Sequence, residues 1–208
     1  MTAKDVDGAR RDPTDQRRDD MLEAAAQLIA ERGFGETRIS DVARRVGASP
    51  ALVIYYFGTK DQLLTAALRF SEDAFYDTCT TLMASAGSIR GRLETIVRLS
   101  FEADSSDVGA WGLWFDLWAQ AFRHSQVAGD RVELERRWRT TIADVVRVGM
   151  EAGEIDPVDA DDFAVTWGAL LDGLSIQVAL QDEMVDADKA TEIAMRFAER
   201  ELALPAAG

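Results

Sequence analysis

Residues 38–57, RISDVARRVGASPALVIYYF, decide the fold of this chain. The pattern predicts a short helix over 41–46, with Ser40 as its N-cap and a glycine at 47 that ends it. Ser49 then caps a second helix that begins with Pro50, because a proline at the first helical position loses no hydrogen bond. Two short helices joined by a tight turn have the spacing of a helix-turn-helix. An ordinary helical hairpin with capped ends fits the spacing equally well.

The side chains of this segment suit contact with DNA. Hydroxyl groups and cations donate hydrogen bonds to phosphate oxygens. Donors of this kind stand at Ser40, Ser49, Tyr55, Tyr56 and Lys60. In a helix-turn-helix the second helix lies in the major groove, with its first residues at the base edges. The segment is therefore a candidate DNA-reading unit.

Helical periodicity continues along the rest of the chain, whereas strand patterns are weak. Predicted helices cover residues 21–33, 41–46, 50–57, 60–85, 89–105, 108–124, 126–152, 161–182 and 187–204. We expect an all-α protein of about nine helices, in which an N-terminal three-helix head precedes a helical body.

The charge of the chain is negative but unevenly distributed. The formal net charge is −14, yet residues 1–69 hold 11 basic and 11 acidic side chains, so the excess lies in the body. DNA responds to the local field, because salt screens charges beyond about 10 Å. One cysteine and one histidine exclude a disulfide framework and zinc sites built from several cysteines or histidines. We expect a cytoplasmic protein without cofactor, bound metal or membrane span.

Residues 21–64, MLEAAAQLIAERGFGETRISDVARRVGASPALVIYYFGTKDQLL, resemble the N-terminal domain of the TetR family of transcriptional regulators. The resemblance implies an arm over 1–14, a DNA-binding domain over 15–69 and an effector-binding and dimerisation domain over 70–208. It further implies that phosphates are contacted by Arg38, Ser40, Ser49, Tyr55, Tyr56 and Lys60, and bases by Pro50, Ala51 and Leu52. The second helix lacks Arg, Asn and Gln for bidentate base pairing. Specificity then rests on methyl contacts, on Arg44 or Arg38, and on DNA deformability.

The body holds all five tryptophans of the chain. One helical face carries Trp111, Trp114, Phe115, Trp118 and Phe122, at steps of three and four residues. Such a stripe is either hydrophobic core or the wall of a ligand cavity. Residues 111–155 resemble the choline/betaine-pathway subgroup of the same family, which favours an effector pocket. Trp138, Trp167 and Asp172 complete the candidate effector-binding residues.

A cationic effector would suit an aromatic pocket with a carboxylate nearby, because ring faces attract cations. Asp116, Glu102 and Asp172 are the candidate carboxylates. His124 is interpreted as a helix-end residue, and Cys79 as a small core residue.

The last two predicted helices carry a wide apolar face. The face is formed by Phe163, Gly168, Leu171, Leu174, Val178 and Met195. The pattern is explained either by packing within the chain or by a dimer contact. The family resemblance implies that these helices pair with their symmetry mates in a C2 homodimer. Two recognition helices about 34–36 Å apart then bind a palindromic operator.

Together these features predict a repressor that binds double-stranded operator DNA as a homodimer and is released by a small-molecule effector. Two alternatives remain: a helical small-molecule binding protein or enzyme with an incidental helix-turn-helix, and a DNA binder without an effector. The chain shows no nucleophile–base motif and no Gly-rich phosphate loop, so we expect no enzymatic activity.

Overall fold

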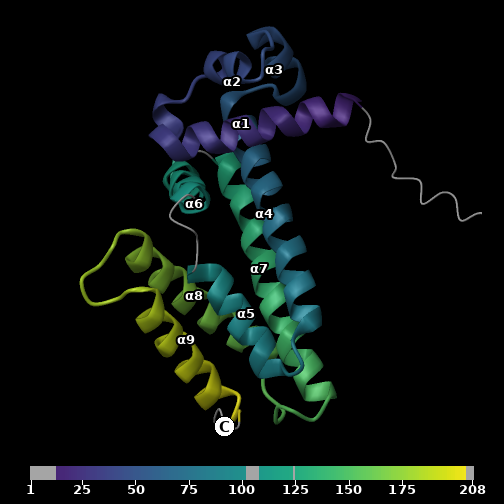
Figure 1. The fold of residues 1–208 in the computed structure, drawn as a ribbon, viewed down its shortest axis with the longest axis vertical. Helices are drawn as coiled ribbons and strands as arrows, with labels where there is room; N and C mark the ends of the chain where they lie inside the picture. The colour runs from purple at the N-terminus through teal and green to yellow at the C-terminus, as the bar shows by residue number, and fades with distance from the viewer. Residues whose placement is uncertain (1–12, 102–107, 124, 205–208) are drawn as a thin grey trace, which may run out of the picture.

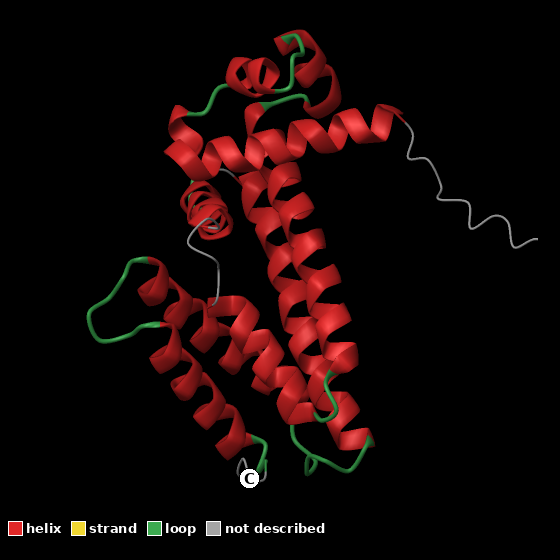
Figure 2. Ribbon diagram, in the orientation of Figure 1, coloured by secondary structure: helices red, strands yellow, loops and turns green. Residues whose placement is uncertain are grey.

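In the computed structural model, which describes residues 13–101, 108–123 and 125–204, every regular element is a helix. The nine helices of these ranges are α1 (Pro13–Glu36), α2 (Ile39–Arg45), α3 (Pro50–Phe57), α4 (Lys60–Ser85), α5 (Ile89–Phe101), α6 (Val108–Ala121), α7 (Ser125–Glu151), α8 (Ala160–Ala179) and α9 (Ala187–Glu201). Figures 1 and 2 show this arrangement. The all-α prediction is confirmed. None of these helices is long and apolar enough to cross a bilayer.

The head consists of α1, α2 and α3, packed on the first turns of α4. Its core includes Met21, Leu28, Val42, Val53 and Phe57, all buried. Gly47, in the turn between α2 and α3, has a φ of +64°. Residues other than glycine rarely adopt this backbone conformation. The Ser49 hydroxyl accepts a hydrogen bond from the backbone N–H of Leu52 at 3.2 Å, as an N-cap does.

The body is built around two long helices, α4 and α7, that run side by side (Figure 1). Its main core joins α5, α7, α8 and α9, with the Trp167 side chain fully buried at the centre. A second cluster links head and body. It joins Ile29 and Phe34 of α1 to Leu64 and Leu68 of α4 and to Leu113 and Leu117 of α6. The two parts of the molecule therefore share a continuous apolar joint.

Two predicted helix starts need correction. Helix α1 begins at Pro13 rather than Met21. The earlier start was not predicted because the first two turns of the helix are polar and carry no apolar periodicity. Helix α2 begins at Ile39 with Arg38 as N-cap, so Ser40 lies in its first turn. The arm predicted over 1–14 lies outside the described residues except for Pro13 and Thr14, which belong to α1. The domain boundary predicted after Arg69 falls inside α4, which therefore serves both parts.

Candidate DNA-binding face and ligand cavity

Helix α3 presents one open face to solvent. Pro50, Ala51, Ile54 and Tyr55 are exposed, and Tyr55 keeps 82% of its surface. Their spacing places them on one side of the helix. Leu52 and Tyr56 are instead half-buried against the head core. Ile54, which the sequence analysis did not place on this face, is also exposed here, and its helical offset from Pro50 and Ala51 could have indicated it.

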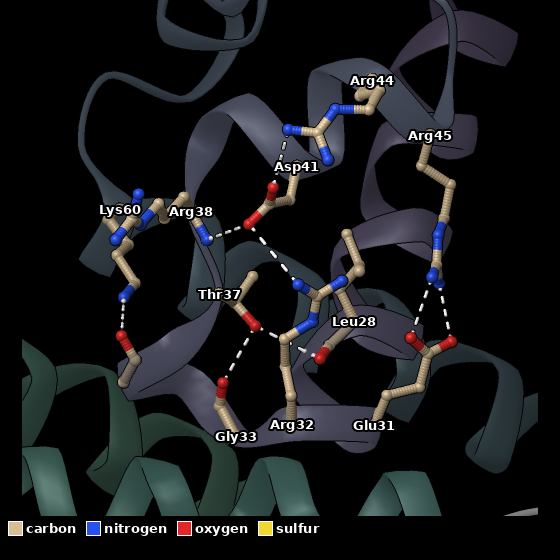
Figure 3. A network of polar contacts seen from close by, with 11 residues as sticks. Leu28, Glu31, Arg32, Gly33, Thr37, Arg38, Asp41, Arg44, Arg45 and Lys60 are labelled. Carbon is tan, nitrogen blue, oxygen red and sulfur yellow. Dashed lines mark hydrogen bonds and ion pairs between the residues drawn. The ribbon is translucent and has the colours of Figure 1, made fainter.

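The arginines of α2 are exposed and held by carboxylates (Figure 3). The Asp41 carboxylate accepts a hydrogen bond from the Arg38 backbone N–H at 3.2 Å and pairs with the Arg44 guanidinium at 3.1 Å. Arg45 forms a two-point pair with Glu31, at 2.9 and 2.8 Å, which lowers the pKa of that carboxyl. These contacts hold Arg44 and Arg45 on the outer surface of the head. The contact with Arg38 is made by its backbone N–H and does not neutralise its guanidinium.

The predicted phosphate contacts differ in how open they are. Arg38, Ser40, Arg44 and Ser49 are exposed. Lys60 instead lies against the end of α1, where its Nζ donates to the Gly35 carbonyl at 3.1 Å and stands 4.3 Å from the centre of the Phe34 ring. Burial lowers the pKa of this ammonium. To reach a phosphate, Lys60 would have to leave these contacts.

A kink at the end of α1 connects the head with the body. Gly33 has a φ of +81°, and the Thr37 hydroxyl closes the kink by hydrogen bonding with the Gly33 and Leu28 carbonyls (Figure 3). The backbone N–H of Phe34 then donates to a carboxylate oxygen of Asp116 in α6 at 2.6 Å. Asp116 was a candidate acidic residue of the pocket; it does not line the cavity and serves this joint instead.

A cavity of about 630 Å³ lies between this joint and the body core. It is lined by Glu23, Ala26 and Gln27 of α1, by Leu68, Phe70, Ser71, Glu72, Ala74, Phe75, Tyr76 and Thr78 of α4, by Leu99 and Ser100 of α5, by Trp111, Trp114 and Trp118 of α6, by Glu135 and Trp138 of α7, and by Leu171, Asp172 and Ser175 of α8. Aromatic rings and carboxylates dominate this wall. Among the described residues, no Lys, Arg or His lines it.

Two of the residues that line the cavity carry a buried polar atom that is unpaired within the described part of the chain. One is Oε2 of Glu72, on a residue that is 6% exposed, and the other is Nε1 of Trp138. Burial raises the pKa of Glu72 to about 7 and that of Asp172 to about 6. An unpaired carboxylate oxygen accepts a hydrogen bond or attracts a cation, and an indole N–H only donates. The wall therefore suits a ligand that carries a positive charge and an oxygen acceptor.

Five of the predicted effector residues line this cavity: Trp111, Trp114, Trp118, Trp138 and Asp172. Three do not. Phe115 stacks beside Trp111 and Trp118 outside the lining, and Phe122 follows the last turn of α6 and is 93% exposed. Trp167 is core, because its indole N–H donates to the Ala194 carbonyl at 3.0 Å between α8 and α9.

Sequence reasoning missed Glu72, which the periodicity of α4 could have indicated. Leu64, Leu68, Glu72 and Tyr76 follow one another at steps of four, and all are buried. A carboxyl group in the middle of an apolar stripe is costly unless it has a partner or a function. Glu102 and His124 lie outside the described residues. Cys79 is fully buried in the body core, as interpreted from the sequence.

The residues predicted for the dimer contact are mostly used inside the chain. Phe163, Gly168, Leu171, Leu174 and Met195 are buried within the protomer, and Val178 is half-buried. The five buried side chains therefore pack within the protomer, which is the first of the two explanations of this face, and their part in a dimer contact stays a prediction. The exposed apolar residues near α8 are instead Val165, Leu180 and Met184.

Comparisons with known proteins agree with the geometry. Residues 21–67 match the family model of bacterial regulatory proteins of the tetR family, and residues 89–203 match that of the BetI-type transcriptional repressor C-terminal domain. The HTH-type transcriptional regulator BetI of Rhizobium meliloti is 30% identical over 85% of both chains. BetI of Agrobacterium fabrum is 32% identical over 79% of this chain and 78% of its own.

Solved structures give the same assignment. A transcriptional regulator from Saccharomonospora viridis, in complex with choline, has a TM-score of 0.79 and 30% identity, covering 91% of this chain and 98% of its own. The sequence-based assignments of family and subgroup are therefore confirmed. With a tetR-type helix-turn-helix in its head and a BetI-type repressor domain as its body, the chain belongs to the TetR family of ligand-responsive transcriptional regulators.

Proposed function

We propose that this regulator represses genes by binding a palindromic operator as a homodimer, and that a small organic cation of the choline type releases it. The observation that carries the proposal is the lining of the cavity. Several aromatic rings and four acidic residues surround a space that no basic side chain of the described residues enters. Ring faces attract quaternary ammonium groups, and the unpaired Trp138 N–H suits a hydroxyl oxygen.

The division of labour follows the two parts of the molecule. Residues 15–69 would read DNA, with Arg38, Ser40, Ser49 and the tyrosines at phosphates and the open face of α3 at base edges. Residues 70–208 would bind the effector and the partner subunit. Because its operator would lie on the bacterial chromosome, we place the protein in the cytoplasm, acting as a regulator and not as an enzyme.

The homodimer would use the outer sides of α8 and α9. Leu180 and Met184, in the segment that connects the two helices, are 70% and 81% exposed and supply apolar area next to them that the protomer does not cover. A two-fold axis between these helices would set two copies of α3 on one side of the dimer, as a palindrome requires. Sedimentation of the full chain, with Leu180→Asp as a variant that should become monomeric, tests this contact.

The position of the cavity supports release by the effector. Glu23 and Gln27 of α1 form part of its wall, and Trp111, Trp114 and Trp118 line it from α6, the helix that carries Asp116. A ligand between these helices would alter the spacing of the two heads. Linkage then requires that DNA and effector weaken each other's binding equally.

The experiment is a fluorescence-anisotropy titration of labelled DNA from the intergenic region beside the gene. We expect tight, salt-sensitive binding that choline reverses. Failure to bind this DNA, while choline still binds, would favour a small-molecule binding protein. Binding that choline and related cations leave unchanged would favour an operator binder without a cationic effector.

A further inference from the structure

Helix α4, which forms part of the cavity wall, carries a buried acidic side chain, and buried carboxylates are rare. Glu72 is 6% exposed, and its Oε2 is buried without a hydrogen-bond partner in the described part of the chain. An ionised carboxylate in such a position is unstable unless a cation or a proton neutralises it. The question is which of the two neutralises Glu72.

Neither of the nearest arginines forms an ion pair with Glu72. Arg69, one turn before it, pairs with Asp130 of α7 at 3.4 Å. Arg137 of α7 pairs with Asp73 at 2.5 Å, and its guanidinium stands 4.0 Å from the centre of the Tyr76 ring. Both arginines lower the pKa of Glu72 through space, but burial outweighs them and Asp73 opposes them.

The other acidic groups of the cavity differ from Glu72. Glu135 of α7 is already paired with Arg131 and Arg139. Glu23 of α1 accepts a hydrogen bond from Gln27 at 3.2 Å and is exposed. Asp172 of α8 faces the same space, half-buried, and is influenced by Glu135 and Arg139. Helices α5 and α6 add no charged side chain to the lining.

We infer that the Glu72 carboxyl selects a positively charged effector and exchanges a proton for it. At low pH the carboxyl of the empty cavity holds a proton; when the cation enters, the O–H bond breaks, the proton passes to the buffer and the carboxylate faces the ligand's charge. Nothing is oxidised or reduced. The inference rests on the proposed cationic effector and adds the residue that recognises the charge, together with a dependence of release on pH.

The pH window follows from the burial of Glu72. With a pKa of about 7 in the empty cavity, roughly a tenth of the carboxyl is ionised at pH 6 and roughly nine tenths at pH 8. If only the ionised form takes the cation, affinity rises about tenfold over this range. Asp172, whose pKa burial raises to about 6, titrates at the lower edge of the window and adds to the rise there.

The test is isothermal titration calorimetry with choline and with tetramethylammonium, at pH 6, 7 and 8, in phosphate and in MOPS. Because the two buffers differ in ionisation heat, the experiment counts the protons released. We expect release of close to one proton at pH 6, little at pH 8, and affinity about tenfold higher at pH 8. Glu72→Gln should lower the affinity at pH 8 by about tenfold or more and remove the proton release.

The matched control is Asp77→Asn, on the exposed side of the same helix, which removes one negative charge without touching the cavity. It should bind as the parent protein does. Cation binding without proton release, or with undiminished affinity in Glu72→Gln, overturns the inference and leaves the proposed effector class intact. Failure of both cations to bind the parent protein at every pH overturns the proposed effector class, and the inference with it. If Glu72→Gln folds poorly, Asp172→Asn decides the matter: it keeps Glu72 and should still release close to one proton at pH 6, and loss of that release would overturn the inference.

Discussion

The head and the cavity differ in where their charged side chains lie and in whether these are paired. On the head, Arg44 and Arg45 lie at the surface and pair with Asp41 and Glu31, and solvent reaches both guanidinium groups. In the cavity, Glu72 is buried and has an oxygen without a partner. Exposed, paired charges present a surface to DNA at small cost, whereas a buried, unpaired carboxyl is sensitive to any cation or proton that reaches it.

The largest effect is expected from a charge placed in the head core, which should abolish operator binding but not effector binding. Val53 is fully buried in the head core, so Val53→Asp should cost roughly 3–5 kcal/mol by leaving a charge unpaired inside it. Operator binding should be lost in anisotropy measurements, while calorimetry still detects choline. Ile54→Asp adds the same charge on the exposed face of α3 and should leave the unfolding midpoint in place. Loss of choline binding in Val53→Asp would contradict this expectation and show that damage to the head core spreads through the joint into the cavity.

The next largest effect is expected on the pH dependence of the free energy of unfolding, to which the buried Glu72 contributes. Because the folded protein raises the pKa of Glu72 from 4.5 to about 7, it holds this proton more tightly than the unfolded chain does. This contribution to stability is complete below pH 4.5 and is lost as pH rises to 7, by up to about 3 kcal/mol. Urea unfolding without ligand, at pH 5 and pH 8 and at one protein concentration, measures the change. Between these pH values, Glu72→Gln should lose less free energy of unfolding than the parent protein. An equal loss would show that groups other than Glu72 cause the pH dependence.

A third change acts on the joint between the regions. Asp116→Ala removes the acceptor of the Phe34 backbone N–H, a charge-assisted bond of 2.6 Å. We expect operator and choline each to bind, but the effect of one on the other to fall by about 1–2 kcal/mol, since bonds to charged groups contribute about that much. Anisotropy with and without saturating choline measures this coupling. Undiminished coupling in Asp116→Ala would show that the joint acts through its apolar contacts alone.

The smallest effect is expected on the head surface. Glu31→Gln breaks the exposed pair with Arg45 and should leave the unfolding midpoint unchanged. Operator affinity should change only slightly, and the difference should vanish at high salt. A large drop in stability would mean that this pair is not screened as its exposure indicates.

Sequence predicted the fold well because the helices carry their own boundaries. Thr59 and Gln62 form a capping box at the start of α4, and Asp186 caps α9. Where such signs were absent, the prediction was wrong: the polar start of α1 was missed, and its first helical residue is Pro13. Local chemistry thus determines most of the helix ends that the sequence indicated.

The site was harder to predict because periodicity identifies a buried face and not what covers it. Trp114 and Trp167 both stand on apolar faces, yet one lines the cavity and the other is core between α8 and α9. The same ambiguity led the buried side chains of α8 to be assigned to a dimer contact. Glu72 was missed because the helix over 60–85 was predicted without asking which of its residues are buried, although a carboxyl within its apolar stripe was visible in the sequence.

The most direct test of the central claim compares choline with 3,3-dimethylbutan-1-ol, in which carbon replaces the charged nitrogen at nearly the same shape. The two ligands are titrated into the preformed protein–operator complex at pH 8 and anisotropy is recorded. If the cavity responds to positive charge, choline releases the operator and the neutral analogue does not at the same concentrations. Equal release by both ligands would show that shape alone is sensed and would contradict the account.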